Sequence, residues 1–302
     1  MRKAAVIYNP AARTAPKRQR LHDAAASLEP DGWQVELLAT EAAGHATQLA
    51  REAAAAGAEV VFACGGDGTI NEVVNGLVHS QTALGALRAG MGNVFVKEIG
   101  MPRAPAAALR VLLDGELRRF DLGLANGRYF LLMASIGIDA NVVKRVPNKT
   151  KRLLGSISYE LYGLLELVNY KPQLTTLKFD GQTWQGDLFW ALFGNTRSYG
   201  GVLNITSRAL VDDGLLDAYV FEGQGPGWVA STLLRVIGGR HEGASGVSYV
   251  QAREIEVETP GLPVQADGEY FGQTPMRFSV VPAALDVLLP RGKAERLFGK
   301  DT

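Results

Sequence analysis

The chain has 302 residues, of which 47% are hydrophobic and 21% charged, and its 31 basic residues balance its 31 acidic ones. This composition is typical of a globular protein with one large or two medium domains. A net charge of zero excludes a protein-wide basic field, so we expect no nucleic-acid partner. The single cysteine, Cys64, excludes an intrachain disulfide. No apolar run reaches the ~18 residues of a membrane span, so we expect a cytoplasmic protein without a transmembrane segment.

The first ~120 residues alternate strand patterns with helix patterns, which is typical of a parallel sheet covered by helices. We therefore predict an α/β domain over residues 1–121. Strands are expected at residues 4–8, 33–39 and 83–87, and a further strand begins at residue 60. Helices are expected over residues 40–56 and 104–113, and an earlier helix ends near residue 28.

A glycine-rich turn follows the third predicted strand. Gly65-Gly66-Asp67-Gly68-Thr69 joins that strand to a helix pattern that begins at Ile70. Glycines let a ligand approach the backbone, and the free N–H groups of a helix N-terminus bind anions. Thr69 is predicted to cap this helix, with Glu72 completing a capping box. The residues alone leave a phosphate site and an ordinary tight turn about equally favoured.

Asp67 stands at the tip of this turn. A carboxylate beside a polyphosphate is repelled unless Mg²⁺ lies between them, so Asp67 is predicted to face a metal ion or the reacting groups. The alternative is a surface aspartate that simply forms the turn.

The sequence pattern changes near Asp121, where closely spaced strand patterns and Asp-Gly turns begin. These predict a mainly antiparallel β domain over residues 122–290, with the tail 291–302 free to rejoin the first domain. Asp212 and Asp213 place two carboxylates in one turn, which suits a hard cation or a solvated acidic turn.

These motifs resemble the catalytic domain of the diacylglycerol kinase family, which includes bacterial lipid kinases, sphingosine kinases and ceramide kinases. NAD kinases share only the glycine turn. The resemblance implies an α/β N-terminal domain with a parallel sheet, as in NAD kinases and diacylglycerol kinases, followed by a mainly antiparallel β-sandwich. It rests, in chain order, on 9–10, 65–69, 92–93, 121–123, 137–140, 200–201, 212–216 and 267–269.

The resemblance also implies a nucleotide site in the first domain. Met91 stands where the family usually has a threonine, and a thioether cannot donate the hydrogen bond of a hydroxyl. The implied ATP-binding residues are Asn9, Pro10, Arg13, Thr40, Gly65, Gly66, Asp67, Gly68, Thr69, Asn71, Met91, Gly92 and Asn93.

Catalytic and metal roles follow from the same resemblance. Glu269 matches the family's proposed general base, and the resemblance implies that Asp67 is the second catalytic residue. Asp213 and the carbonyls of Leu210 and Leu215 match a structural Mg²⁺ site. Asp121 is a weaker candidate for the metal network.

The sequence therefore predicts an ATP- and Mg²⁺-dependent kinase that phosphorylates a lipid hydroxyl at the membrane surface. Peripheral association with the inner membrane face and a homodimer are left open. The alternatives are a soluble-substrate kinase of the NAD kinase type and a non-catalytic nucleotide- or lipid-binding regulator. A basic segment, 144–152, precedes an apolar helical pattern over 153–168; a helix packed on its own core is favoured over membrane contact.

Overall fold

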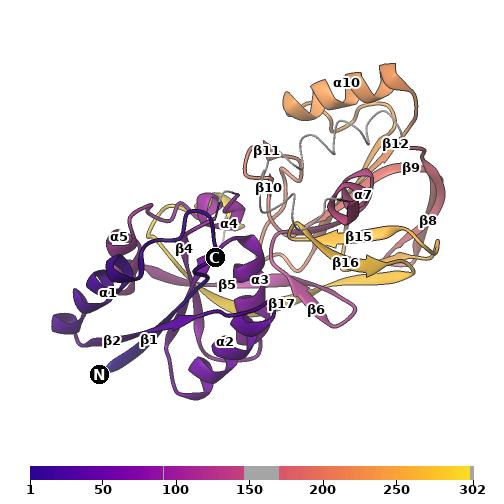
Figure 1. The fold of residues 1–302 in the computed structure, drawn as a ribbon. Helices are drawn as coiled ribbons and strands as arrows, with labels where there is room; N and C mark the ends of the chain where they lie inside the picture. Colours follow the sequence, from indigo (N-terminus) through magenta and orange to yellow (C-terminus); the bar gives the residue numbers. More distant parts are fainter. Residues whose placement is uncertain (91, 146–169, 300–302) are drawn as a thin grey trace. The chain divides into compact units, whose positions relative to one another are not determined.

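The computed structural model of the protein describes residues 1–90, 92–145 and 170–299 (Figure 1). The chain divides into two compact units, Met1–Leu122 with Pro282–Thr302, and Gly123–Val281. Met91, most of the basic segment and the apolar pattern after it lie outside the described residues. No helix in the described parts is both long and apolar enough to cross a bilayer.

The first unit is built on a parallel sheet in the order β4-β3-β1-β2. Its strands are the short apolar runs that the sequence predicts, and their side chains form the core; Val6, Ile7, Val61 and Phe62 are fully buried. The bounds are β1 (Arg2–Tyr8), β2 (Trp33–Ala39), β3 (Val60–Gly65) and β4 (Ala83–Arg88).

Helices cover both faces of this sheet (Figure 1). α2 and α3 pack on each other on one face, and α1 and α5 pack on each other on the other face. The helices of this unit are α1 (Arg18–Ala26), η1 (Glu29–Asp31), α2 (His45–Ala55), α3 (Asp67–Leu77), α4 (Val94–Glu98), α5 (Pro105–Leu109), α6 (Val111–Asp114) and η2 (Glu295–Leu297).

The predicted capping box at Thr69 is wrong. α3 begins at Asp67, with Gly66 as its N-cap residue, so Thr69 already lies inside the helix. The Glu72 carboxylate instead accepts the amides of Gly44 (2.8 Å) and Ala46 (3.1 Å). It thereby caps α2, which starts later than predicted, at His45. A side chain from a neighbouring helix satisfies these N–H groups, and local spacing does not reveal that.

Antiparallel pairs build the second unit, as predicted. β9 is central and pairs with β7, β8 and β12. The Asp267-Gly268 turn joins β15 to β16. The remaining elements are β5 (Glu116–Ala125), β6 (Arg128–Phe130), β7 (Met133–Gly137), α7 (Ile138–Arg145), β8 (Gln173–Phe179), β9 (Gln182–Gly194), β10 (Ser198–Tyr199), β11 (Leu203–Asn204), β12 (Leu216–Glu222), α10 (Pro226–Ile237), β13 (Val247–Ala252), β14 (Glu254–Val257), β15 (Pro263–Ala266), β16 (Glu269–Gln273) and β17 (Met276–Leu289).

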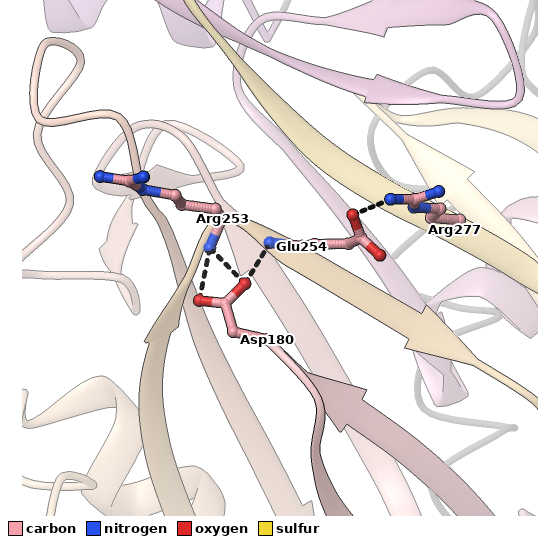
Figure 2. Close-up of polar contacts among 4 residues, drawn as sticks. All are labelled: Asp180, Arg253, Glu254 and Arg277. Carbon is pink, nitrogen blue, oxygen red and sulfur yellow. Dashed lines mark hydrogen bonds and ion pairs between the residues drawn. The ribbon is translucent and has the colours of Figure 1, made fainter.

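The other predicted Asp-Gly turn, at Asp180, joins β8 to β9 and also holds β14 (Figure 2). Both carboxylate oxygens of Asp180 accept the amide of Arg253, and one accepts that of Glu254 at 2.9 Å. The side chain of Glu254 in turn pairs with Arg277 on β17. Asp180 is thus a turn aspartate whose carboxylate is used to pair strands.

Candidate functional site

The predicted nucleotide-binding loops of the first unit lie at one edge of its sheet. Tyr8, the last residue of β1, pairs with Ala39 of β2 and Cys64 of β3, and Gly65 pairs with Arg88 of β4. The carboxyl ends of these strands are therefore level with one another. The loops that begin at Asn9, Thr40, Gly66 and Ala89 all leave from this edge.

The strand order also marks where a ligand is expected. The chain passes from β1 outward to β2 and then returns across β1 to β3 and β4. Ligands of open α/β sheets bind at such a switch point, outside the carboxyl ends of the strands. Here the switch point lies between β1 and β3, so the loops starting at Asn9 and Gly66 flank it.

Gly66 is the N-cap residue of α3 and has no side chain to occupy the space in front of the helix. Its backbone is extended, with φ −78°, so its conformation does not require glycine. A Cβ added there would meet nothing within 4 Å. The first N–H groups of an α-helix have no partner within the helix. Together these features leave room for an anion at the start of α3.

Gly90, in contrast, is needed for packing. A Cβ at this position would lie 2.7 Å from the Cα of Gly66, so the loop after β4 touches the glycine turn backbone to backbone. Gly92 is similarly close, because its Cβ would lie 2.8 Å from the Asp67 carboxylate.

Asp67 binds the loop after β4 to the glycine turn. Its Oδ1 accepts the Val94 amide at 2.8 Å, which makes Asp67 a cap for α4. Burial raises the pKa of the Asp67 carboxyl, and hydrogen bonds from the amides of Val94, Phe95 and Asn93 act in the opposite direction. The predicted reactive residue therefore also has a structural role.

Asn93 has a positioning role that the sequence did not reveal. It is fully buried, and its Oδ1 accepts the amides of Gly90 (2.7 Å) and Ala89 (3.1 Å). Its Nδ2 donates to the carbonyl of Gly65 at 2.9 Å. Asn93 also has a left-handed backbone, φ 44°, which asparagine tolerates well. The amide of Asn93 thus joins the two loops.

The remaining predicted nucleotide residues occupy varied positions. Asn9 is half-buried, and its Oδ1 accepts the Ala11 amide at 2.9 Å, while Pro10 and Arg13 are exposed. Thr40 is half-buried and donates its amide to the Tyr8 carbonyl. Asn71 is buried on α3, where its side-chain oxygen accepts a hydrogen bond from Asn75.

The predicted metal turn lies in the second unit, directly before β12. The half-buried Asp213 accepts the Leu215 amide at 3.0 Å, so the turn is closed by its own carboxylate. The donor set of one carboxylate and two carbonyls is all oxygen, which fits Mg²⁺, an ion that keeps several waters. Asp121 accepts the Ala283 amide at 2.7 Å and is buried. In residues 1–90, 92–145 and 170–299 no cluster of three or more acidic, histidine or cysteine side chains suits a metal ion.

Glu269 is the first residue of β16 and is half-buried. The turn before it is held from within the second unit. Asp267, with φ 49°, accepts the amides of Leu131 (2.8 Å), Leu132 (2.8 Å) and Met133 (3.2 Å). The glutamate therefore follows a fixed turn and keeps access to solvent.

Both parts of the chain match models of known protein families. Residues 3–125 match the family model "Diacylglycerol kinase catalytic domain", and residues 133–289 match "YegS C-terminal NAD kinase beta sandwich-like domain". The chain is 31% identical over 301 residues to a diacylglycerol kinase of Bacillus subtilis (strain 168), covering 98% of this chain and 99% of the relative. It is 34% identical over 279 residues to "Probable lipid kinase YegS-like" of Chromohalobacter salexigens, covering 91% of this chain and 90% of the relative.

The fold is also shared with a solved structure. The crystal structure of a diacylglycerol kinase from Bacillus anthracis str. Sterne matches with a TM-score of 0.75 over 97% of this chain and 98% of that chain, at 19% identity. The predicted fold, a parallel α/β domain followed by a β-sandwich, is thereby confirmed. The chain belongs to the diacylglycerol kinase family of lipid kinases.

Proposed function

We propose that this lipid kinase uses ATP and Mg²⁺ to phosphorylate a lipid hydroxyl, with diacylglycerol as the first acceptor to test. The names of the relatives favour a lipid acceptor over NAD. The nucleotide would bind residues 1–121 and the lipid residues 122–290. The enzyme would work from the cytoplasm, as a peripheral protein at the inner face of the membrane.

The observation that best supports the proposed ATP site is the open space at Gly66. A Cβ at Gly66 would meet no atom within 4 Å outside its two chain neighbours, and this glycine is the N-cap residue in front of the first N–H groups of α3, which have no partner within the helix. That place lies at the β1/β3 switch point, beside Asn9. We assign the ATP phosphates to it, because backbone N–H groups and a helix N-terminus both favour negative charge.

In the proposed reaction, the lipid hydroxyl oxygen bonds to the γ-phosphorus and the bond from that phosphorus to the bridging β-γ oxygen breaks. Glu269 takes the hydroxyl proton, and ADP leaves. Asp67, whose Oδ1 is fixed by the Val94 amide, would hold the Mg²⁺ ion and so help to orient the phosphates. When bound, Mg²⁺ would neutralise the negative charge of the phosphates. A second, structural Mg²⁺ is assigned to Asp213 and the carbonyls of Leu210 and Leu215.

The test is phosphate transfer from γ-labelled ATP to a panel of diacylglycerol, a sphingoid base, phosphatidylglycerol and a polyprenol in detergent micelles. NAD serves as the soluble comparison. We expect label in one lipid and none in NAD. Label in NAD alone, or ATP binding without transfer to any acceptor, would overturn the proposal.

A further inference from the structure

A chain of buried hydrogen bonds in the second unit ends at the turn before Glu269. It involves Ser135 on β7, Asp139 on α7 and Gln265 on β15. Ser135 and Gln265 are paired in the β7–β15 register, so their side chains lie on the same face of the sheet. These residues are at most 9% exposed.

Asp139 is the centre of this chain. Its Oδ2 accepts the hydroxyl of Ser135 at 2.6 Å, the amide of Gln265 at 3.3 Å and the hydroxyl of Tyr199 at 3.4 Å. Its Oδ1 accepts the amide of Ala140 at 2.7 Å. A buried carboxylate is costly unless it is hydrogen-bonded, and here both oxygens are.

Gln265 transmits this arrangement to the turn. Its Nε2 donates to Ser135 Oγ (2.7 Å) and Asp139, whereas its Oε1 accepts the amide of Gly268 (2.9 Å). An amide side chain has one donor end and one acceptor end. Because the donor end faces the Asp139 carboxylate, the acceptor end must face Gly268. Gly268 directly precedes Glu269 and has a left-handed backbone, φ 80°.

We infer that Asp139, Ser135 and Gln265 are positioning residues that hold the Gly268 amide and thereby set the direction of the Glu269 side chain. The inference rests on the proposed role of Glu269 as general base. None of these residues needs to touch the lipid or the nucleotide. A displaced turn would move the Glu269 carboxylate while leaving the nucleotide loops unchanged.

The key variant is Gln265→Leu, which keeps the approximate side-chain size and removes both ends of the link. We expect faster hydrogen exchange at the Gly268 amide and an unchanged KM for ATP. The kcat should fall about 10- to 100-fold, which is the loss expected when a catalytic group such as the Glu269 carboxylate is misplaced by about 1 Å. The control is Thr175→Val on β8. Thr175 is also fully buried and donates one hydrogen bond, to the Gln173 carbonyl at 2.8 Å, but β8 does not pair with the hairpin. This control should leave Gly268 exchange and kcat unchanged.

A double-mutant cycle with Glu269→Gln tests whether the effect acts through the glutamate. Residues that act as a unit are non-additive, so Gln265→Leu should lower kcat no further in the Glu269→Gln background. An equal loss in both backgrounds, or unchanged Gly268 exchange in Gln265→Leu, would overturn the inference. A fully active Glu269→Gln variant would instead refute the general base, while the exchange measurement would still report whether Gln265 holds the turn.

Discussion

The Asp67 carboxylate accepts the Val94 amide at 2.8 Å, and this bond joins the glycine turn after β3 to the start of α4 after β4. Asn93 reinforces the junction by bonding to Gly65, Ala89 and Gly90. The proposed phosphate site is therefore built from two loops that are fixed to each other. Because these loops are already fixed, the backbone N–H groups at the start of α3 need no rearrangement when a phosphate binds.

Alanine at Gly66 and at Gly90 should have different effects on stability. Gly66→Ala meets open space at an ordinary φ, so the entropy gain of replacing glycine and the poorer N-cap preference of alanine oppose each other, and the unfolding free energy should change by less than about 1 kcal/mol. The same methyl group should weaken ATP binding at least about tenfold if phosphate occupies that space. Gly90→Ala should instead cost about 1–3 kcal/mol, because its Cβ strikes the Gly66 backbone. Denaturant unfolding and ATP titration calorimetry measure both quantities; unchanged ATP affinity in Gly66→Ala would place the phosphates elsewhere.

Asp67→Asn should separate the structural role of this residue from its chemical role. The amide oxygen can still accept the Val94 N–H, so the unfolding free energy should change by less than about 1 kcal/mol. Phosphoryl transfer should fall at least about 100-fold, because the charge that orients the metal-bound phosphates is lost. Asp67→Ala is the comparison: it leaves the Val94 amide without its acceptor and should cost about 1–3 kcal/mol. A folded Asp67→Asn enzyme with wild-type turnover contradicts the assignment.

Asp213→Asn should abolish stabilisation of the protein by Mg²⁺. An ion at about 100 times its Kd stabilises the native state by about 2.7 kcal/mol, which raises the melting temperature of the wild type. The matched control is Asp180→Asn, since Asp180 is also a turn aspartate but bonds to the amides of Arg253 and Glu254. Melting curves with and without Mg²⁺ should differ for wild type and Asp180→Asn only. An equal Mg²⁺ response in Asp213→Asn would exclude this turn as the site.

Asp139 should make stability depend on pH between about 4 and 6. Burial raises the pKa of Asp139 from 3.8 to about 6, and its hydrogen bonds only partly oppose this. The folded state then binds a proton more tightly than the unfolded state, so stability falls as pH rises through this window. At 1.36 kcal/mol for each pKa unit, the wild type should lose about 2–3 kcal/mol relative to Asp139→Asn between pH 4 and pH 7. Urea unfolding of both proteins at pH 4 and pH 7 measures the difference; a constant gap would show that Asp139 does not titrate there.

Local patterns were sufficient for much of the fold. Short apolar runs alternating with helix patterns identified β1 to β4, and Asp-Gly pairs identified the turns at Asp180 and Asp267. The glycine turn, together with the other motifs in the family's chain order, identified the family that the comparisons confirm. Cys64 is buried at the end of β3, in the apolar run that forms this strand, and its burial raises the pKa of the thiol to about 12.

The misplaced helix starts have one physical cause. Thr69 and Glu72 have the spacing of a capping box, but Glu72 bonds to amides of α2, 26 and 28 positions away in the chain. Hydrogen-bond partners from distant segments compete with local ones, and only the packed structure decides between them.

What the sequence by itself determined is the set of chemical groups: glycines for a close backbone approach, carboxylates at Asp67, Asp213 and Glu269, and strand patterns that carry them. Only the tertiary structure decided that Asn93 and Asp67 join two loops and that Gln265 links Asp139 to the turn before Glu269. The reason is that a buried polar group must find its partner wherever the fold brings one, and that partner can be more than 100 residues away.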